Sequence, residues 1–109
     1  MKPVVFLADS LDRLRAFPDR ARRSSGYQLD RVQRGLDPED WKPVATVGPG
    51  VREIRVRDAS GAYRVVFVAN LNDAVYVLHA FQKKTQRTSA RDLLLAQSRF
   101  RELKHGALR

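Results

Sequence analysis

The chain has 109 residues, with 21 Lys and Arg against 12 Asp and Glu, and a formal net charge of +9. This length predicts a single domain over residues 1–109. The lack of cysteine excludes a disulfide framework and a thiolate metal site, and two histidines are too few for a His-rich metal centre. The first apolar run stops at Asp9, short of a signal peptide, and no stretch approaches the roughly 20 apolar residues of a membrane span. We therefore expect a cytoplasmic protein with no metal, no cofactor and no membrane contact.

The positive charge is concentrated in the C-terminal half. Residues 1–50 hold 9 basic and 7 acidic side chains, whereas residues 51–109 hold 12 and 5. Such a field favours a polyanionic partner, with nucleic acid the first candidate and an acidic protein the second.

The N-terminal third predicts one strand and two helices. Residues 4–6 make a short β-type run, after which Asp9 or Ser10 can cap a helix that Pro18 ends. A second helix is expected from Pro18 to Arg34, with Gly35 as its C-terminal stop. Its buried stripe is Ala21, Ser25, Leu29 and Val32.

Residues 36–50 are rich in Pro, Gly and acid, and they predict a connector. Three strands follow, over residues 51–57, 62–69 and 74–82, as an antiparallel meander. Ser89 and Asp92 have capping-box spacing and should begin a last helix that lies against the sheet and stops near Gly106. The predicted fold class is α+β, with a helical hairpin and a C-terminal helix on a mainly antiparallel sheet of about four strands.

Alternation along the strands predicts where the charges point. Glu53, Arg55 and Arg57 should share one face of the first long strand. Arg64 is the one charge in an apolar run, so it either pairs with an acid such as Glu53 or opens into a cleft. Strict alternation also puts the residues of the third strand in two sets, Val75, Val77, His79, Phe81 and Lys83 against Tyr76, Leu78 and Ala80.

Each of these residues also has a purely structural interpretation. Arg64 suits an ion pair as well as a phosphate contact, and His79 suits a histidine in or beside the core. Lys83, Lys84 and Arg87 suit a solubilising tip, and Phe81 suits the core.

The order and spacing of several segments resemble the RelE toxin superfamily, in its phage-derived HigB-like branch. The segments are Tyr-Gln-Leu-Asp at 27–30, Trp-Lys-Pro at 41–43, Val-Arg-Glu-Ile-Arg at 51–55, Ala-Tyr-Arg-Val-Val-Phe-Val-Ala at 62–69 and Val-Leu-His-Ala-Phe-Gln-Lys-Lys-Thr at 77–85. The resemblance implies a RelE-like microbial ribonuclease fold. It also implies the toxin of a type II toxin–antitoxin pair, which enters the ribosome, cuts translated mRNA and is silenced by a helix-turn-helix, HigA-like antitoxin.

The implied chemistry needs no metal. The 2′-hydroxyl beside the scissile bond attacks the phosphate, and cations stabilise the charge that develops. By motif position, the resemblance makes Arg64 the phosphate-contacting arginine and puts a second catalytic cation at Lys83 or Lys84. Arg55, Arg57 and Arg87 would complete an RNA-binding cluster, and Phe81 would offer a stacking surface.

Proton transfer has two candidates in the sequence. No tyrosine follows Lys84, and His105 is near the C-terminus, so His79 is the best-placed titratable group. The alternative is a lysine of the tip whose pKa neighbouring cations lower.

Three functions follow from these observations. The first is an endoribonuclease toxin that acts on ribosome-bound mRNA. The second is a catalytically silent RNA-binding or antitoxin-binding protein on the same fold. The third is a basic adaptor for an acidic protein.

Overall fold

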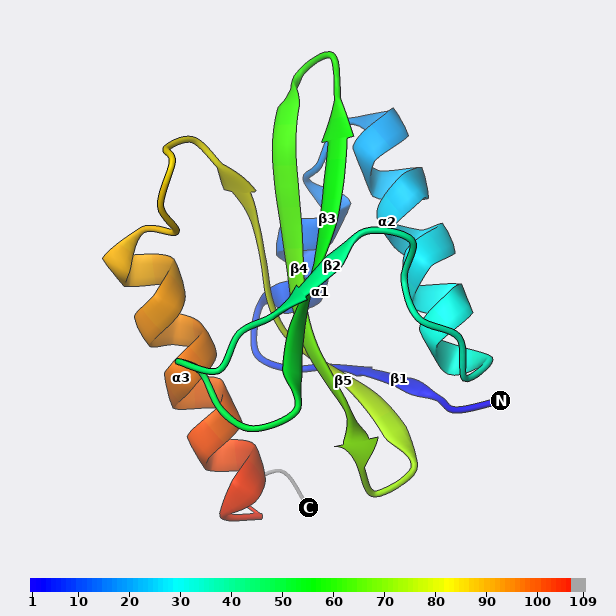
Figure 1. Cartoon of the computed structure of the whole chain (residues 1–109), viewed down its shortest axis with the longest axis vertical. Coiled ribbons are helices and arrows are strands. Elements are labelled where there is room, and N and C mark those ends of the chain that lie inside the picture. Colours follow the sequence, from blue (N-terminus) through cyan, green and yellow to red (C-terminus); the bar gives the residue numbers. More distant parts are fainter. Residues whose placement is uncertain (107–109) are drawn as a thin grey trace.

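The computed structural model describes residues 1–106. The chain forms a five-stranded mixed sheet with helices on both faces (Figure 1). In chain order the elements are β1 (Val4–Phe6), α1 (Ser10–Arg15), α2 (Asp19–Gln33), β2 (Trp41–Pro43), β3 (Val51–Asp58), β4 (Gly61–Leu71), β5 (Ala74–Lys83) and α3 (Ala90–Lys104). The strand order is β1-β5-β4-β3-β2, with β1 parallel to β5 and every other pair antiparallel. The α+β class and the antiparallel meander are confirmed. The RelE-like fold remains a prediction.

The expected count of about four strands was one too low. Residues 41–43, placed in the connector, form β2 on the outer edge of β3, where Trp41 pairs with Ile54. The guanidinium carbon of Arg52 lies 4.0 Å from the centre of the Trp41 ring. A three-residue strand that ends at Pro43 carries no alternation, so periodicity could not reveal it.

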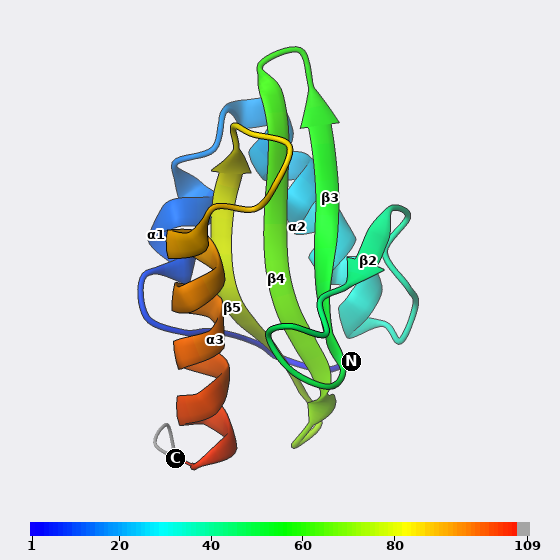
Figure 2. The same ribbon diagram turned by 60° about the vertical axis from the view of Figure 1, so that its left-hand side comes forward.

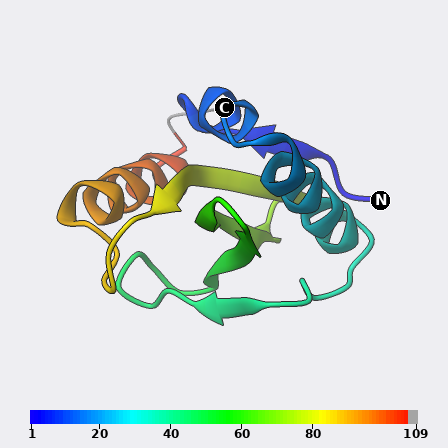
Figure 3. The ribbon, with the colours of Figure 1, turned by 90° about the horizontal axis from the view of Figure 1, so that it is seen from above.

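Each face of the sheet has its own buried apolar cluster. One joins α1 and α2 to residues such as Ile54, Val65 and Val77. The other joins α3 to residues such as Val51 and Val66. Figure 2 shows α3 in front of the sheet and α1 and α2 behind it, and Figure 3 shows the same layers from above.

The helix predictions hold for α2 and α3 and need correction for α1. The whole predicted stripe of α2 is buried, and Gly35 follows the helix with φ +83°. In α3 the backbone N–H of Asp92 donates to Ser89 Oγ at 3.1 Å, which confirms the cap. Asp9 is the N-cap residue of α1, as expected, but its side chain makes no cap hydrogen bond because it binds two arginines, and Ser10 Oγ donates to a carbonyl of β5.

A bulge in β5 overturns the strict alternation expected there. Val66 pairs with His79 and Phe67 pairs with Val77, so Leu78 is an extra residue in β5. Val77 and Ala80 consequently pack on the α1–α2 side, while Phe81 packs on the α3 side. The bulge places Phe81 and Lys83 on the same face as Arg64.

No helix within residues 1–106 is long and apolar enough to cross a membrane.

Candidate functional site

On the face of the sheet that α3 packs against, two neighbouring rows of cross-strand partners contain cations. Arg55 of β3 lies opposite Arg64 of β4, and Arg64 lies opposite Phe81 of β5. In the next row Ala62 lies between Arg57 and Lys83. Because side chains alternate along a strand, Arg55 and Arg57 project on the same face as Val51, which packs beneath α3. The sheet therefore presents its charges together at one end.

These rows form the floor of an open cleft of about 670 Å³. Six of the nine residues that line it are cationic, and the set is Lys42, Arg55, Arg57, Ala62, Arg64, Lys83, Lys84, Thr85 and Gln86. Arg57 and Lys84 are exposed and Arg55 and Lys83 are half-buried. Four strands or their ends supply these side chains, so the sheet brings the cations together.

Arg64 is the buried member of the cleft, with 3% of its surface exposed. Its Nη1 donates to the carbonyl of Tyr63 at 3.0 Å, and its Nε has no hydrogen-bond partner within the described residues. Glu53 Oε1 lies 3.8 Å from that Nε. Burial lowers the pKa of Arg64 from its ordinary value, Glu53 opposes this, and the charges of Arg55 and Arg57 add to it. Arg64 was expected either to pair with an acid or to open into a cleft, and it does both, since it lies near the carboxylate of Glu53 and lines the cleft.

A second cavity, a hollow of about 380 Å³, lies next to the cleft. Both cavities are lined by Lys83, Lys84 and Thr85, and we call these three residues the ridge. Its remaining lining residues are Arg13, Phe81, Gln82, Arg87, Ser89 and Asp92. The N-terminal end of α3 and the loop before it therefore form one wall, and α1 contributes Arg13.

His79 does not reach the cleft. It has no exposed surface, and its Nε2 lies 2.7 Å from Asp92 Oδ1 while its Nδ1 lies 3.1 Å from Arg99 Nη1. Arg99 Nη2 also donates to Asp9 at 2.6 Å, so one polar network joins α1, β5 and α3. Burial lowers the pKa of His79, although Asp92 opposes the shift. The structure agrees with the interpretation of His79 as a core histidine.

The predicted residues thus fall into three groups. Arg55, Arg57, Arg64, Lys83 and Lys84 gather around the cleft, Phe81 and Arg87 line the hollow, and His79 lies beneath α3. Phe81 is 6% exposed and stacks on His79 with ring centres 5.2 Å apart, which leaves little ring surface for a base.

Sequence reasoning missed several residues of this site. Lys42 comes from the unrecognised strand β2, and Arg13 comes from α1. The partners of His79, Asp92 and Arg99, are 13 and 20 residues away in the chain. The capping-box spacing marked Asp92 as a cap residue, but no sequence signal linked it to His79.

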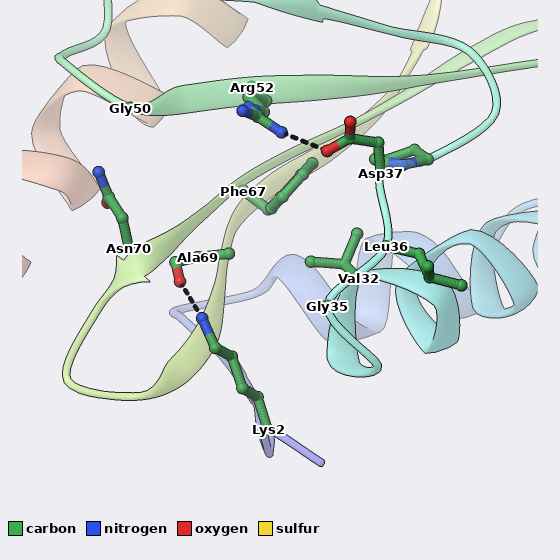
Figure 4. A pocket seen from close by; sticks show the side chains of 11 residues that line it. Lys2, Val32, Gly35, Leu36, Asp37, Gly50, Arg52, Phe67, Ala69 and Asn70 are labelled. Carbon is green, nitrogen blue, oxygen red and sulfur yellow. Dashed lines mark hydrogen bonds and ion pairs between the residues drawn. The ribbon is translucent and has the colours of Figure 1, made fainter.

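A third cavity, of about 240 Å³, lies on the other face of the sheet, at the other end of β3 and β4 (Figure 4). Val32 and Phe67 form part of its wall. Its cations already have partners, since Lys2 Nζ donates to the carbonyl of Ala69 at 2.6 Å and Arg52 pairs with Asp37 at 3.0 Å. None of the predicted site residues lines it. Within residues 1–106 no three His, Asp or Glu side chains gather where they could hold a metal ion.

The comparisons with known proteins give one family. No curated protein matches the chain in sequence. The family model described as "Phage derived protein Gp49-like (DUF891)" matches residues 12–101, which include α2, all the strands except β1, and most of α3. The chain therefore belongs to the phage-derived Gp49-like proteins, a toxin-like family of the RelE and Gp49 type that is associated with toxin ribonucleases.

Proposed function

We propose that this protein is the toxin of a type II toxin–antitoxin system, of the HigB-like branch, and that it cleaves translated mRNA on the ribosome in the cytoplasm. The observation that carries the proposal is the cleft in which five further cations surround Arg64, whose Nε makes no hydrogen bond to the described part of the chain. A buried donor without a partner is costly, and a phosphate oxygen would satisfy it. Membership of a toxin-like family supports the same conclusion.

In the proposed reaction the RNA supplies its own nucleophile. The 2′-hydroxyl oxygen attacks the adjacent phosphorus, a 2′,3′-cyclic phosphate forms, and the 5′-oxygen of the next nucleotide leaves with a proton. Arg64 contacts the phosphate through its fork, and Arg55 and Arg57 stabilise the additional negative charge of the pentacoordinate intermediate. No step in this scheme calls for a metal ion.

Proton transfer falls to the lysines of the cleft. Arginine stays protonated in proteins and cannot exchange a proton near neutral pH, and His79 has no exposed surface. We assign the proton donated to the leaving 5′-oxygen to Lys84, which is exposed on the ridge, with Lys83 beside it. The 2′-hydroxyl proton is taken up by water.

The second candidate is a catalytically silent protein that binds RNA or a helix-turn-helix, HigA-like antitoxin. One observation favours it, since no histidine or tyrosine lines the cleft within the described residues. Both candidates predict RNA binding, and cleavage distinguishes them.

The deciding experiment incubates purified protein with mRNA-programmed ribosomes and, separately, with the naked mRNA, and maps cut sites by primer extension. The toxin proposal expects cuts that require ribosomes and are lost in Lys84→Ala. Arg101→Ala is the matched control, because Arg101 is exposed near the C-terminal end of α3, outside both cavities, and forms no ion pair within the described residues. Folded wild-type protein that cuts neither substrate would leave the binding protein as the function.

A further inference from the structure

The hollow beyond the ridge combines cations with one carboxylate. Lys83, Lys84 and Arg87 have no ion-pair partner within residues 1–106, whereas Arg13 is paired with Asp9 at 2.9 Å. The lone acid is Asp92, whose side chain is 19% exposed. Free cations suit a phosphate, but a carboxylate repels one. The hollow is therefore built for a ligand that carries both an anionic group and hydrogen-bond donors.

Hydrogen bonds from His79 and Ser89 hold the carboxylate of Asp92 in place. Oδ1 lies 2.7 Å from His79 Nε2, and Oδ2 accepts from Ser89 Oγ at 2.6 Å. Arg99 can only donate, so it donates to His79 Nδ1. Nδ1 then carries no proton, and Nε2–H must donate to Asp92. Each carboxylate oxygen keeps lone pairs beyond these bonds, and Asp92 lines the hollow.

The charge state of Asp92 supports this role. Burial alone would raise the pKa of Asp92, but the hydrogen bonds from Ser89 and His79 outweigh burial, and its pKa is lowered. The side chain is thus an ionised, acceptor-only group near neutral pH. A ligand group that faces it must present donors.

Guanine matches an ionised carboxylate better than the other bases do. Its Watson–Crick edge presents two adjacent donors, N1–H and the N2 amino group, which can meet the two oxygens of one carboxylate. Adenine and cytosine each offer one amino group beside an acceptor nitrogen, and uracil offers one N–H between two acceptor carbonyls. Single-stranded RNA is commonly read on this edge.

We propose that the hollow is a guanine-nucleotide subsite in which Asp92 accepts from the guanine edge and Arg87, with the ridge lysines, holds the phosphate. The inference rests on the proposed function for its biological meaning, because the RNA strand would cross the ridge from the cleft. A guanosine would then lie next to the cleaved bond. Asp92 is a specificity-determining residue in this scheme and takes no part in the chemical step.

The test measures binding of four probes, GMP, AMP, CMP and UMP, by NMR chemical-shift titration of the full chain, with inorganic phosphate as a fifth. GMP should bind at least about tenfold more tightly than the other nucleotides, as expected for a two-bond base contact. Asp92→Asn replaces one acceptor by a donor, and it should bring GMP down to the level of AMP. Arg87→Ala should weaken all four nucleotides to a similar extent.

Asp73→Asn is the matched control and should leave every affinity unchanged. Asp73 is in the β4–β5 turn with φ +57°, a conformation that Asn accepts, and it lines neither the hollow nor the cleft. Equal binding of the four nucleotides by the wild type would overturn the inference even if Asp92→Asn failed to fold. Equal binding of phosphate as well would make the hollow a plain anion site.

The nucleotide ranking needs no ribosome, so it separates this inference from the proposed function. Ribosome-dependent cuts without a guanosine preference would sink the guanine subsite and leave the toxin function intact. A clear preference for GMP from a protein that cuts no RNA would keep the subsite and favour the silent binding protein.

Discussion

Arg55 of β3 and Arg64 of β4 are direct partners across the antiparallel pair, and both project into the cationic cleft. Like charges in this arrangement destabilise a sheet. Burial is the first cause of the lowered pKa of Arg64, and the charge of Arg55 adds to it. The protein thus carries a repulsive cluster on its central strands, an arrangement typical of a site that binds an anionic ligand.

Replacing Arg55 should therefore stabilise the fold while it weakens the proposed activity. In Arg55→Thr, a residue with high strand preference faces Arg64 without repelling it. We expect the free energy of unfolding to rise by about 0.2–1 kcal/mol at low salt, and cleavage to fall. Urea denaturation at 20 mM and 500 mM salt measures the effect, which should shrink at the higher concentration because salt screens the repulsion. A variant less stable than wild type at low salt would contradict this account of the pair.

The geometry of the Arg64 fork should matter more than its charge. Arg64→Lys keeps a cation but loses the planar donors that contact phosphate in pairs. We expect the cleavage rate to fall about 100-fold or more, the scale of losing one preorganised donor to a developing oxyanion. Single-turnover cleavage on programmed ribosomes measures the rate, and circular dichroism confirms the fold. Wild-type cleavage by Arg64→Lys would show that the charge suffices without the fork, and wild-type cleavage by Arg64→Ala would remove Arg64 from the mechanism.

Local sequence pattern predicted most elements of this fold. The stripe of α2, the meander and the cap of α3 are short-range features, and their bounds agree with prediction to within two residues. Strand β2 could not be found because its three residues gain their strand character by pairing with β3. The bulge at Leu78 was also invisible, since it is a property of how β5 meets β4 and not of β5 alone.

Some features of the candidate site could likewise be predicted from local sequence, and others could not. The basic residues of β3 and of the ridge were predictable because alternation and position along one hairpin place them together. The surroundings of His79 were not, because Arg99 and Asp92 reach it only after α3 packs on the sheet. Burial of His79 then assigns it to the support of Asp92 and excludes it from the cleft.

His79 should make the stability of the protein depend on pH. Its folded-state pKa is lowered below its ordinary value of 6.5, mainly by burial. The unfolded chain therefore binds a proton more readily than the folded one between those two pKa values. The stabilisation that neutral His79 provides is complete above pH 6.5 and is lost as the pH falls through the folded pKa.

Urea denaturation between pH 7.5 and pH 5 measures this dependence. His79→Gln should flatten the curve over this range and cost about 1–3 kcal/mol at pH 7.5, because Asp92 or Arg99 loses its buried partner. His105→Gln is the matched control, since His105 is exposed at the end of α3, and it should keep the wild-type curve. A His79→Gln curve that still falls between pH 6.5 and pH 5 would assign the dependence to other groups.

Salt dependence should show whether RNA binds at the cleft or follows the net charge of the protein. A protein that neutralises several phosphates of single-stranded RNA releases counterions, so the logarithm of the binding constant falls with the logarithm of salt concentration, by about 0.7 per phosphate contact. Arg57→Ala and Lys84→Ala each remove one exposed cation of the cleft and should each lower that slope by about 0.7. Fluorescence anisotropy with a 2′-O-methyl RNA, which cannot be cleaved, measures the slope. Arg101→Ala should leave it unchanged, whereas equal losses in all three variants would mean that the RNA follows net charge and not the cleft.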